Sequence, residues 1–196
     1  MRYKRTIDPT FDAITLEEAR LHLKEPSNIT AEDDLILSFI QTAGDVVQTK
    51  THKVIGTSTW KAYADTWPES NIITINKNPI TSITSVSYYN SSNVLTAMVE
   101  GTDYIIDTTG EQSSASPFRI YLINKPGLYT RINSIEIVFV AGYLTPQTVD
   151  TRIKQAVRLY LTDWKENRTD YVTGKIVSPL PRSVEYLINQ IRTDEF

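Results

Sequence analysis

Asp163 and Glu166 are the carboxylates whose spacing best suits acid–base or metal chemistry. They stand three positions apart, so in a helix they share one face, as a catalytic pair or a metal site requires. The same stretch carries Lys165, Asn167 and Arg168, and such charges commonly decorate a solvated helix surface or a subunit contact. We therefore favour a surface role for the pair. A hydrolase that uses Asp163 and Glu166 is the alternative.

The other titratable candidates stand near the ends of predicted helices. His22 and His52 are isolated in the sequence, and a histidine at a helix end more simply interacts with the last-turn carbonyls than with a metal or substrate. Asp33 and Asp34 suit the positive end of a helix dipole. The chain also lacks the GxGxxG, Walker, GxSxG and HExxH motifs. We therefore predict that the protein is not an enzyme and holds no cofactor or metal.

The aromatic residues of the middle of the chain offer a different chemistry. A row of exposed rings could bind sugars or stack on bases. Aromatic residues are also enriched in strands generally, so packing within a sheet is the simpler interpretation. A β-module that binds glycan or a cell surface stays open as an alternative. The residues concerned are Trp60, Trp67, Tyr88, Tyr89, Tyr104, Tyr121, Tyr129 and Tyr143.

The composition excludes several classes of protein. The 196 residues are 40% hydrophobic and 22% charged, as in soluble globular proteins, and no run of about 18 apolar residues could span a membrane. The chain has no cysteine, so it can form no disulfide, thiolate zinc site or cysteine nucleophile. A net charge of -3 argues against a sequence-independent grip on DNA, which depends on lysine and arginine.

Helical signals stand at the two ends of the chain. Thr15-Leu16-Glu17-Glu18 is a capping box that predicts a short helix to about Lys24. A second start signal, Thr30-Ala31-Glu32-Asp33, predicts a helix that ends near Thr51, and the clearest apolar stripe runs over residues 153–168. A last stripe contains Val184, Leu187, Ile188 and Ile191. The long stripe needs partner helices, so the two ends of the chain must meet in space.

Strand signals lie between the helical ends. β-branched and aromatic residues alternate over residues 58–63, 71–75, 83–89, 94–99, 104–107, 118–122 and 135–140. Tight turns between them favour an antiparallel sheet or small sandwich. The predicted fold is therefore α+β: a helical bundle from both chain ends, with an antiparallel β insert in the middle. We expect a flexible arm over residues 1–13, a helical body over 14–52 and 148–196, and the β-rich insert over 53–147.

The ordered motifs resemble the head-tail connector (adaptor, head-completion) proteins of long-tailed bacteriophages and prophages. The resemblance covers residues 14–192. It rests on Thr15-Leu16-Glu17-Glu18-Ala19-Arg20-Leu21-His22-Leu23, Glu32-Asp33-Asp34-Leu35-Ile36, the stretch from Asn78-Pro79 to Tyr88-Tyr89, Asp103-Tyr104-Ile105-Ile106-Asp107, Val138-Phe139-Val140-Ala141-Gly142-Tyr143, the 153–168 helix, and Leu180-Pro181-Arg182-Ser183-Val184-Glu185-Tyr186-Leu187.

The resemblance implies a structural protein of the virion neck, made in the host cytoplasm. Its copies would form a ring, expected to be a dodecamer, beneath the portal protein, where DNA passes through the channel without specific binding. The ring would present a surface to the next neck, stopper or tail-completion protein, with no membrane involved. A tail-completion or terminator protein is the nearest alternative. The residues expected to contact the portal or a neighbouring subunit are Asp163, Glu166, Arg168, Arg182, Tyr186, Arg192 and Phe196.

Overall fold

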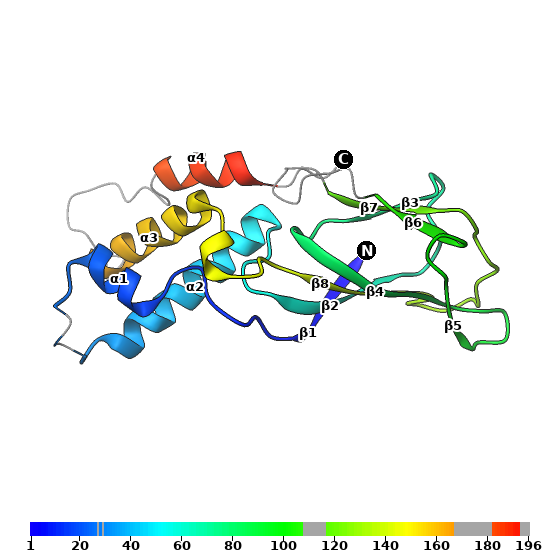
Figure 1. The fold of residues 1–196 in the computed structure, drawn as a ribbon, viewed down its shortest axis with the longest axis horizontal. Helices are drawn as coiled ribbons and strands as arrows, with labels where there is room; N and C mark the ends of the chain where they lie inside the picture. The colour runs from blue at the N-terminus through cyan, green and yellow to red at the C-terminus, as the bar shows by residue number, and fades with distance from the viewer. Residues whose placement is uncertain (27, 29, 108–116, 167–181, 193–196) are drawn as a thin grey trace.

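Helices and strands gather at opposite ends of an elongated molecule (Figure 1). The computed structural model describes residues 1–26, 28, 30–107, 117–166 and 182–192. In it the N-terminal helices pack against the C-terminal helices, and antiparallel sheets lie between them in the sequence. This confirms the predicted α+β class.

The helical body is built around one central helix. Helix α3 (Thr151–Glu166) contacts α1 (Leu16–Leu23), α2 (Asp33–Thr51) and α4 (Arg182–Ile191), so helices from both ends share one core. A short 3-10 helix, η1 (Pro146–Thr148), precedes α3. Apolar side chains spaced three and four residues apart on α3 are buried, as its stripe predicts. They are Ile153, Ala156, Val157, Tyr160 and Leu161.

The capping box that starts α1 forms as predicted. The backbone N–H of Glu18 donates to the Thr15 hydroxyl over 3.1 Å, and the backbone N–H of Thr15 donates to the Glu18 carboxylate over 3.1 Å. Both backbone groups would otherwise lack a partner within the helix. Lys24, in a left-handed conformation with φ of 58°, ends the helix at the predicted place.

Two antiparallel sheets form a sandwich within the described part of the chain. The larger sheet has the order β1 (Arg2–Ile7), β2 (Ser58–Ala64), β8 (Ile135–Ala141), β4 (Ile80–Tyr89), β5 (Leu95–Ala97). The smaller sheet has the order β3 (Ile72–Ile75), β7 (Phe118–Leu122), β6 (Tyr104–Ile106). Alternate residues of β8 are buried, because successive side chains of a strand point to opposite faces. The buried residues of both sheets form one apolar cluster, separate from that of the helices.

Strand β1 corrects the sequence analysis, which expects a flexible arm over residues 1–13. Arg2–Ile7 pairs antiparallel with β2 and forms an edge of the larger sheet. The Tyr3 hydroxyl accepts a hydrogen bond from the backbone N–H of Asn76 over 3.1 Å, and the Tyr3 ring packs edge-on against Phe139. Five of the six residues are classed as exposed, as expected for an edge strand that has little apolar patterning to reveal it.

Candidate assembly site

Polar pairs join α1 to α3 along a seam that runs through successive helical turns. The His22 ring nitrogen Nε2 lies 2.9 Å from the Thr162 hydroxyl, so this last-turn histidine bonds to a side chain of another helix. The paired positions advance together along both helices, which shows that α1 and α3 run side by side in the same direction. The pairs are Glu18 with Arg158 at 3.6 Å, His22 with Thr162, and Glu25 with Lys165.

Asp163 and Glu166 lie beside this seam on the last turns of α3. Glu166 is exposed, while Asp163 is half-buried. Lys165, between them in the sequence, turns toward α1 and reaches Glu25, with Glu32 at 3.8 Å. No group of three or more histidine, cysteine or acidic side chains within the described ranges could hold a metal ion. The lysine between this pair therefore joins α3 to the segment that follows α1.

Helix α4 presents a polar outer face and buries its apolar stripe. Val184, Ile188 and Ile191 are buried against the other helices, whereas the Tyr186 side chain is 66% exposed. Arg182 is the first residue of α4. Arg168 and Phe196, the other predicted contact residues, lie outside the described residues.

A groove of about 560 Å³ separates the end of α2 from α4. Arg192 and His52 line it, with Lys50 and Glu185. His52 ends α2 in a left-handed conformation, with φ of 58°, so it stands at a helix end as the sequence predicts. The groove therefore brings two of the predicted features, the α2 terminus and Arg192, to one surface of the helical body.

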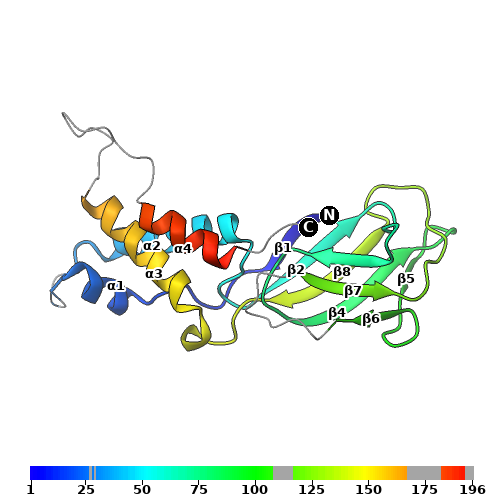
Figure 2. The same cartoon turned by 90° about the horizontal axis from the view of Figure 1, so that it is seen from above.

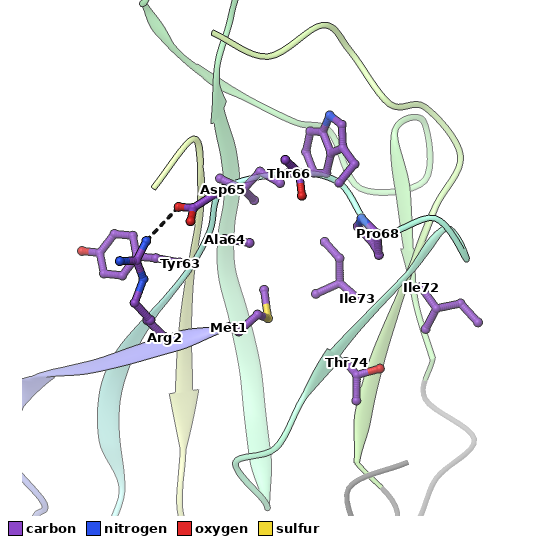
Figure 3. A pocket seen from close by; sticks show the side chains of 12 residues that line it. Met1, Arg2, Tyr63, Ala64, Asp65, Thr66, Pro68, Ile72, Ile73 and Thr74 are labelled. Carbon is purple, nitrogen blue, oxygen red and sulfur yellow. Dashed lines mark hydrogen bonds and ion pairs between the residues drawn. The ribbon is translucent and has the colours of Figure 1, made fainter. Parts of the chain in front are cut away.

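A cleft of about 540 Å³ opens in the sandwich between the ends of β1 and β2 and the strand β3 (Figure 3). Its floor is apolar and includes the buried residues Ile73 and Ile135. At its rim, Arg2 donates to the Asp65 carboxylate over 2.8 Å. Arg2 also donates to the Asn133 side chain over 2.8 Å. Sequence reasoning missed this cleft, because its residues come from four separate segments of the chain.

The aromatic residues of the β region divide between core and surface. Trp60, Trp67 and Tyr88 pack against the sandwich core, and Tyr104 is buried in it. Tyr121 and Tyr129 are 48% and 41% exposed, respectively. Packing in the sheets thus accounts for several of the rings, as the strand pattern favours.

A joint of close backbone contacts connects the helical body to the sandwich. Glycine is required at two positions: a Cβ on Gly142 would lie 2.4 Å from the carbonyl oxygen of Gly56, and one on Gly56 would lie 2.3 Å from that of Phe11. The backbone N–H of Tyr143 donates to Ile55 over 2.9 Å, and the Thr57 hydroxyl donates to Tyr143 over 2.6 Å. Three passages of the chain between the bodies therefore meet here.

Buried polar residues are concentrated at the same joint. Lys53 is only 2% exposed, and burial lowers its pKa to about 8, an effect that the nearby Asp150 carboxylate opposes. Asp150 receives a two-pronged contact from Arg152, which holds the pKa of the Asp150 carboxyl below its usual range. Burial also raises the pKa of Tyr143 to about 12. Sequence reasoning missed this cluster, because Lys53 and Asp150 are about a hundred positions apart and become neighbours only in the fold.

Several charged groups of the described residues pair with one another. Arg20 pairs with Asp33, and Lys165 pairs with Glu25, whereas Asp150 and Arg152 pair within one segment at the joint. No described helix combines the length and apolar character needed to cross a membrane.

The fold as a whole is shared with solved proteins. No protein-family model and no curated protein sequence matches the chain. A chain from the virion of a native gene transfer agent particle is 21% identical, with a TM-score of 0.79. Chains from the neck of the empty particle, computed with C6 symmetry, and of the native particle, computed with C12 symmetry, are 20% and 19% identical, with TM-scores of 0.78 and 0.73.

These similarities extend over the complete length of the molecule. Each covers 100% of this chain and 97% of the other. The helical bundle, the sandwich and their arrangement therefore belong to one fold that this chain shares with chains of gene transfer agent particles.

Proposed function

We propose that this chain is a structural component of the neck of a virus-like particle, and that it acts there as the adaptor ring beneath the portal. The observation that carries the proposal is the full-length structural similarity to chains from a gene transfer agent virion and from its neck. A shared domain could be reused in unrelated settings, but here both the helical body and the sandwich match together.

The site itself supports a role without catalysis. Its charged residues link helices, as Arg20 does with Asp33, and the joint at Gly142 holds two bodies against each other. An adaptor holds the head and the tail in a fixed relative position, which requires a rigid connection between its two bodies but no reacting groups. The net charge of -3 also suits a channel through which DNA slides without being held.

The outer face of the helical body is the proposed contact surface for the portal or a neighbouring subunit. Glu166 and Tyr186 are exposed there, and Arg192 lines the groove between α2 and α4. Exposed aromatic and arginine side chains are enriched in protein interfaces, since they combine large contact area with hydrogen bonding. Arg182, Arg168 and Phe196 belong to the same proposal through the family resemblance, and Asp163 through its place beside the seam.

Deleting the gene from a strain that produces the particles tests the function. We expect electron micrographs to show DNA-filled heads without tails, and purified wild-type protein should restore tail joining when added to those heads. The Gly127→Ala variant, whose new Cβ meets open space, is the matched protein control. Normal particles from the deletion strain would refute the proposal. Finished heads whose tails alone are incomplete would instead identify a tail-completion protein.

A further inference from the structure

The sandwich has two lateral sides formed by unpaired strand edges. Strand order places β1 and β5 at opposite edges of the larger sheet, while β3 and β6 are the edges of the smaller one. Asn76, just after β3, bonds to Tyr3 of β1, whereas Glu100, just after β5, bridges to Tyr104 of β6. Hence β1 and β3 share one side, and β5 and β6 the other; Figure 2 shows β1 and β6 on opposite sides.

The β1 side carries an unpaired positive charge. Of its three basic residues, Arg2 pairs with Asp65 and Arg5 pairs with Asp8. Lys4 is exposed and has no ion-pair partner among the described residues. It stands directly opposite Lys61 on β2, whose charge is taken up by an ion pair with Glu136 at 2.7 Å. An acidic group from a second molecule would give Lys4 a partner.

The β5–β6 side is apolar with an acidic border. Val99 and Ile105 are 60% and 50% exposed, and Ile105 pairs across the strands with the exposed Tyr121. Glu100 is exposed and has no ion-pair partner in the described part of the chain. Asp103, which follows in the same turn, accepts a hydrogen bond from the backbone N–H of Val99 over 2.8 Å, so this border is fixed in shape. An apolar centre with a charged rim is the usual anatomy of a protein interface.

We propose that copies of this chain associate head to tail through their sandwiches, with the β1 side of one copy against the β5–β6 side of the next. The unpaired charges of the two sides, Lys4 and Glu100, have opposite sign, and charge complementarity of this kind selects partner and register. They also lie on opposite flanks of one molecule, so the contact is heterologous and each copy keeps a free side for a further copy. The inference rests on the proposed ring and assigns the surfaces that close it.

Cross-linking through single cysteines tests the contact, since the native chain has no cysteine. The full chain carrying both Lys4→Cys and Glu100→Cys is treated with a short bis-maleimide at high protein concentration. We expect a series of dimers, trimers and longer products, because a head-to-tail contact propagates. The matched control joins Glu100→Cys with Ser38→Cys, an exposed serine on α2 away from the groove, and should give at least tenfold less product.

Charge exchange supplies a second readout that misfolding cannot imitate. Lys4→Glu and Glu100→Lys should each weaken self-association severalfold at low salt, as measured by analytical ultracentrifugation. The double variant should recover it, because the opposite charges meet again with reversed sign. Higher salt should reduce these differences, since screening shortens the range of exposed charges.

The outcomes separate this contact from the neck function. Products that stop at dimers, or a control pair that cross-links equally well, would overturn the head-to-tail contact. If ultracentrifugation shows oligomers but the cysteine pair gives no cross-linked product, the head-to-tail contact is wrong. The proposed function would still stand. No association of any kind at high concentration also counts against the contact. A deletion strain with normal particles would refute the neck function, whatever the cross-linking shows.

Discussion

Replacing Gly142 with alanine should weaken the joint between the helical body and the sandwich. Gly142 has φ of +118°, a conformation that side chains rarely adopt, and its new Cβ would lie 2.4 Å from the Gly56 carbonyl oxygen. The contacting atoms are backbone, so no flexible side chain can move aside. Gly142→Ala therefore combines an unfavourable backbone conformation with a steric clash.

The size of the effect follows from the two contributions. A residue held in a sparsely populated backbone region costs about 1–3 kcal/mol. Forcing an additional carbon into a close-packed site costs about another 1–3 kcal/mol. We expect Gly142→Ala to lower the free energy of unfolding by about 2–6 kcal/mol. For a chain of this length, each kcal/mol lowers the melting temperature by roughly 2–4 °C.

Three other glycines separate the contributions. Gly56→Ala adds a clash, with the Phe11 carbonyl oxygen 2.3 Å away, at a φ that is not positive; Gly101→Ala adds only a positive φ, of +80°, in open space. Gly127→Ala adds neither. We expect about 1–3 kcal/mol for Gly56→Ala, about 1–2 for Gly101→Ala, and a change within about 0.5 for Gly127→Ala.

Urea denaturation of the four variants, followed by circular dichroism, measures these differences. The order of destabilisation should be Gly142→Ala, then Gly56→Ala and Gly101→Ala, then Gly127→Ala. A Gly142→Ala protein no less stable than Gly101→Ala would show that the contact with Gly56 does not tie the two bodies together. The reasoning about the joint would then be wrong.

Two further predictions concern the same joint. The pKa of Lys53 is lowered from 10.5 to about 8 in the folded protein, so the unfolded chain binds more protons between these values. Stability should therefore rise by about 3 kcal/mol as pH increases through this window. Lys53→Met should be more stable at pH 7 and lack this part of the rise in urea titrations; a parallel pH profile would contradict the assignment. Removing residues 1–7 and 58–141, and joining Thr57 to Gly142, should leave a helical protein by circular dichroism, because the helices have their own apolar core. A fully unfolded product would show that the helical body depends on the sandwich.

Several parts of the fold could be predicted because their signals are local. The apolar stripe of α3 and the Thr15 capping box depend on residues within a few positions of one another, so periodicity reveals them. The middle strands show the same locality: β7 begins and ends where the alternation of residues 118–122 predicts. Strand β1 was missed since its pairing with β2 depends on residues over fifty positions away.

The candidate site was less predictable than the fold. The neighbours of Asp163 and Glu166 in the sequence favour a surface position for them, but they do not reveal that Lys165 pairs with Glu25, just after α1. Arg192, an expected contact residue, lines a groove that forms only where α4 lies beside the end of α2. Lys53 shows the limit most clearly, because nothing in its sequence neighbourhood indicates that this lysine is buried.

By itself the sequence determined the kind of secondary structure and its order, the need for both chain ends to meet, and the absence of cysteine chemistry. The tertiary structure alone decided that the first strand joins the sheet, that glycines meet at the joint, and that opposite charges occupy opposite sides of the sandwich. The physical reason is the distance along the chain over which each effect acts. Helix periodicity and capping act within a few residues, whereas burial, steric contact and charge fields depend on distances in space between residues far apart in the chain.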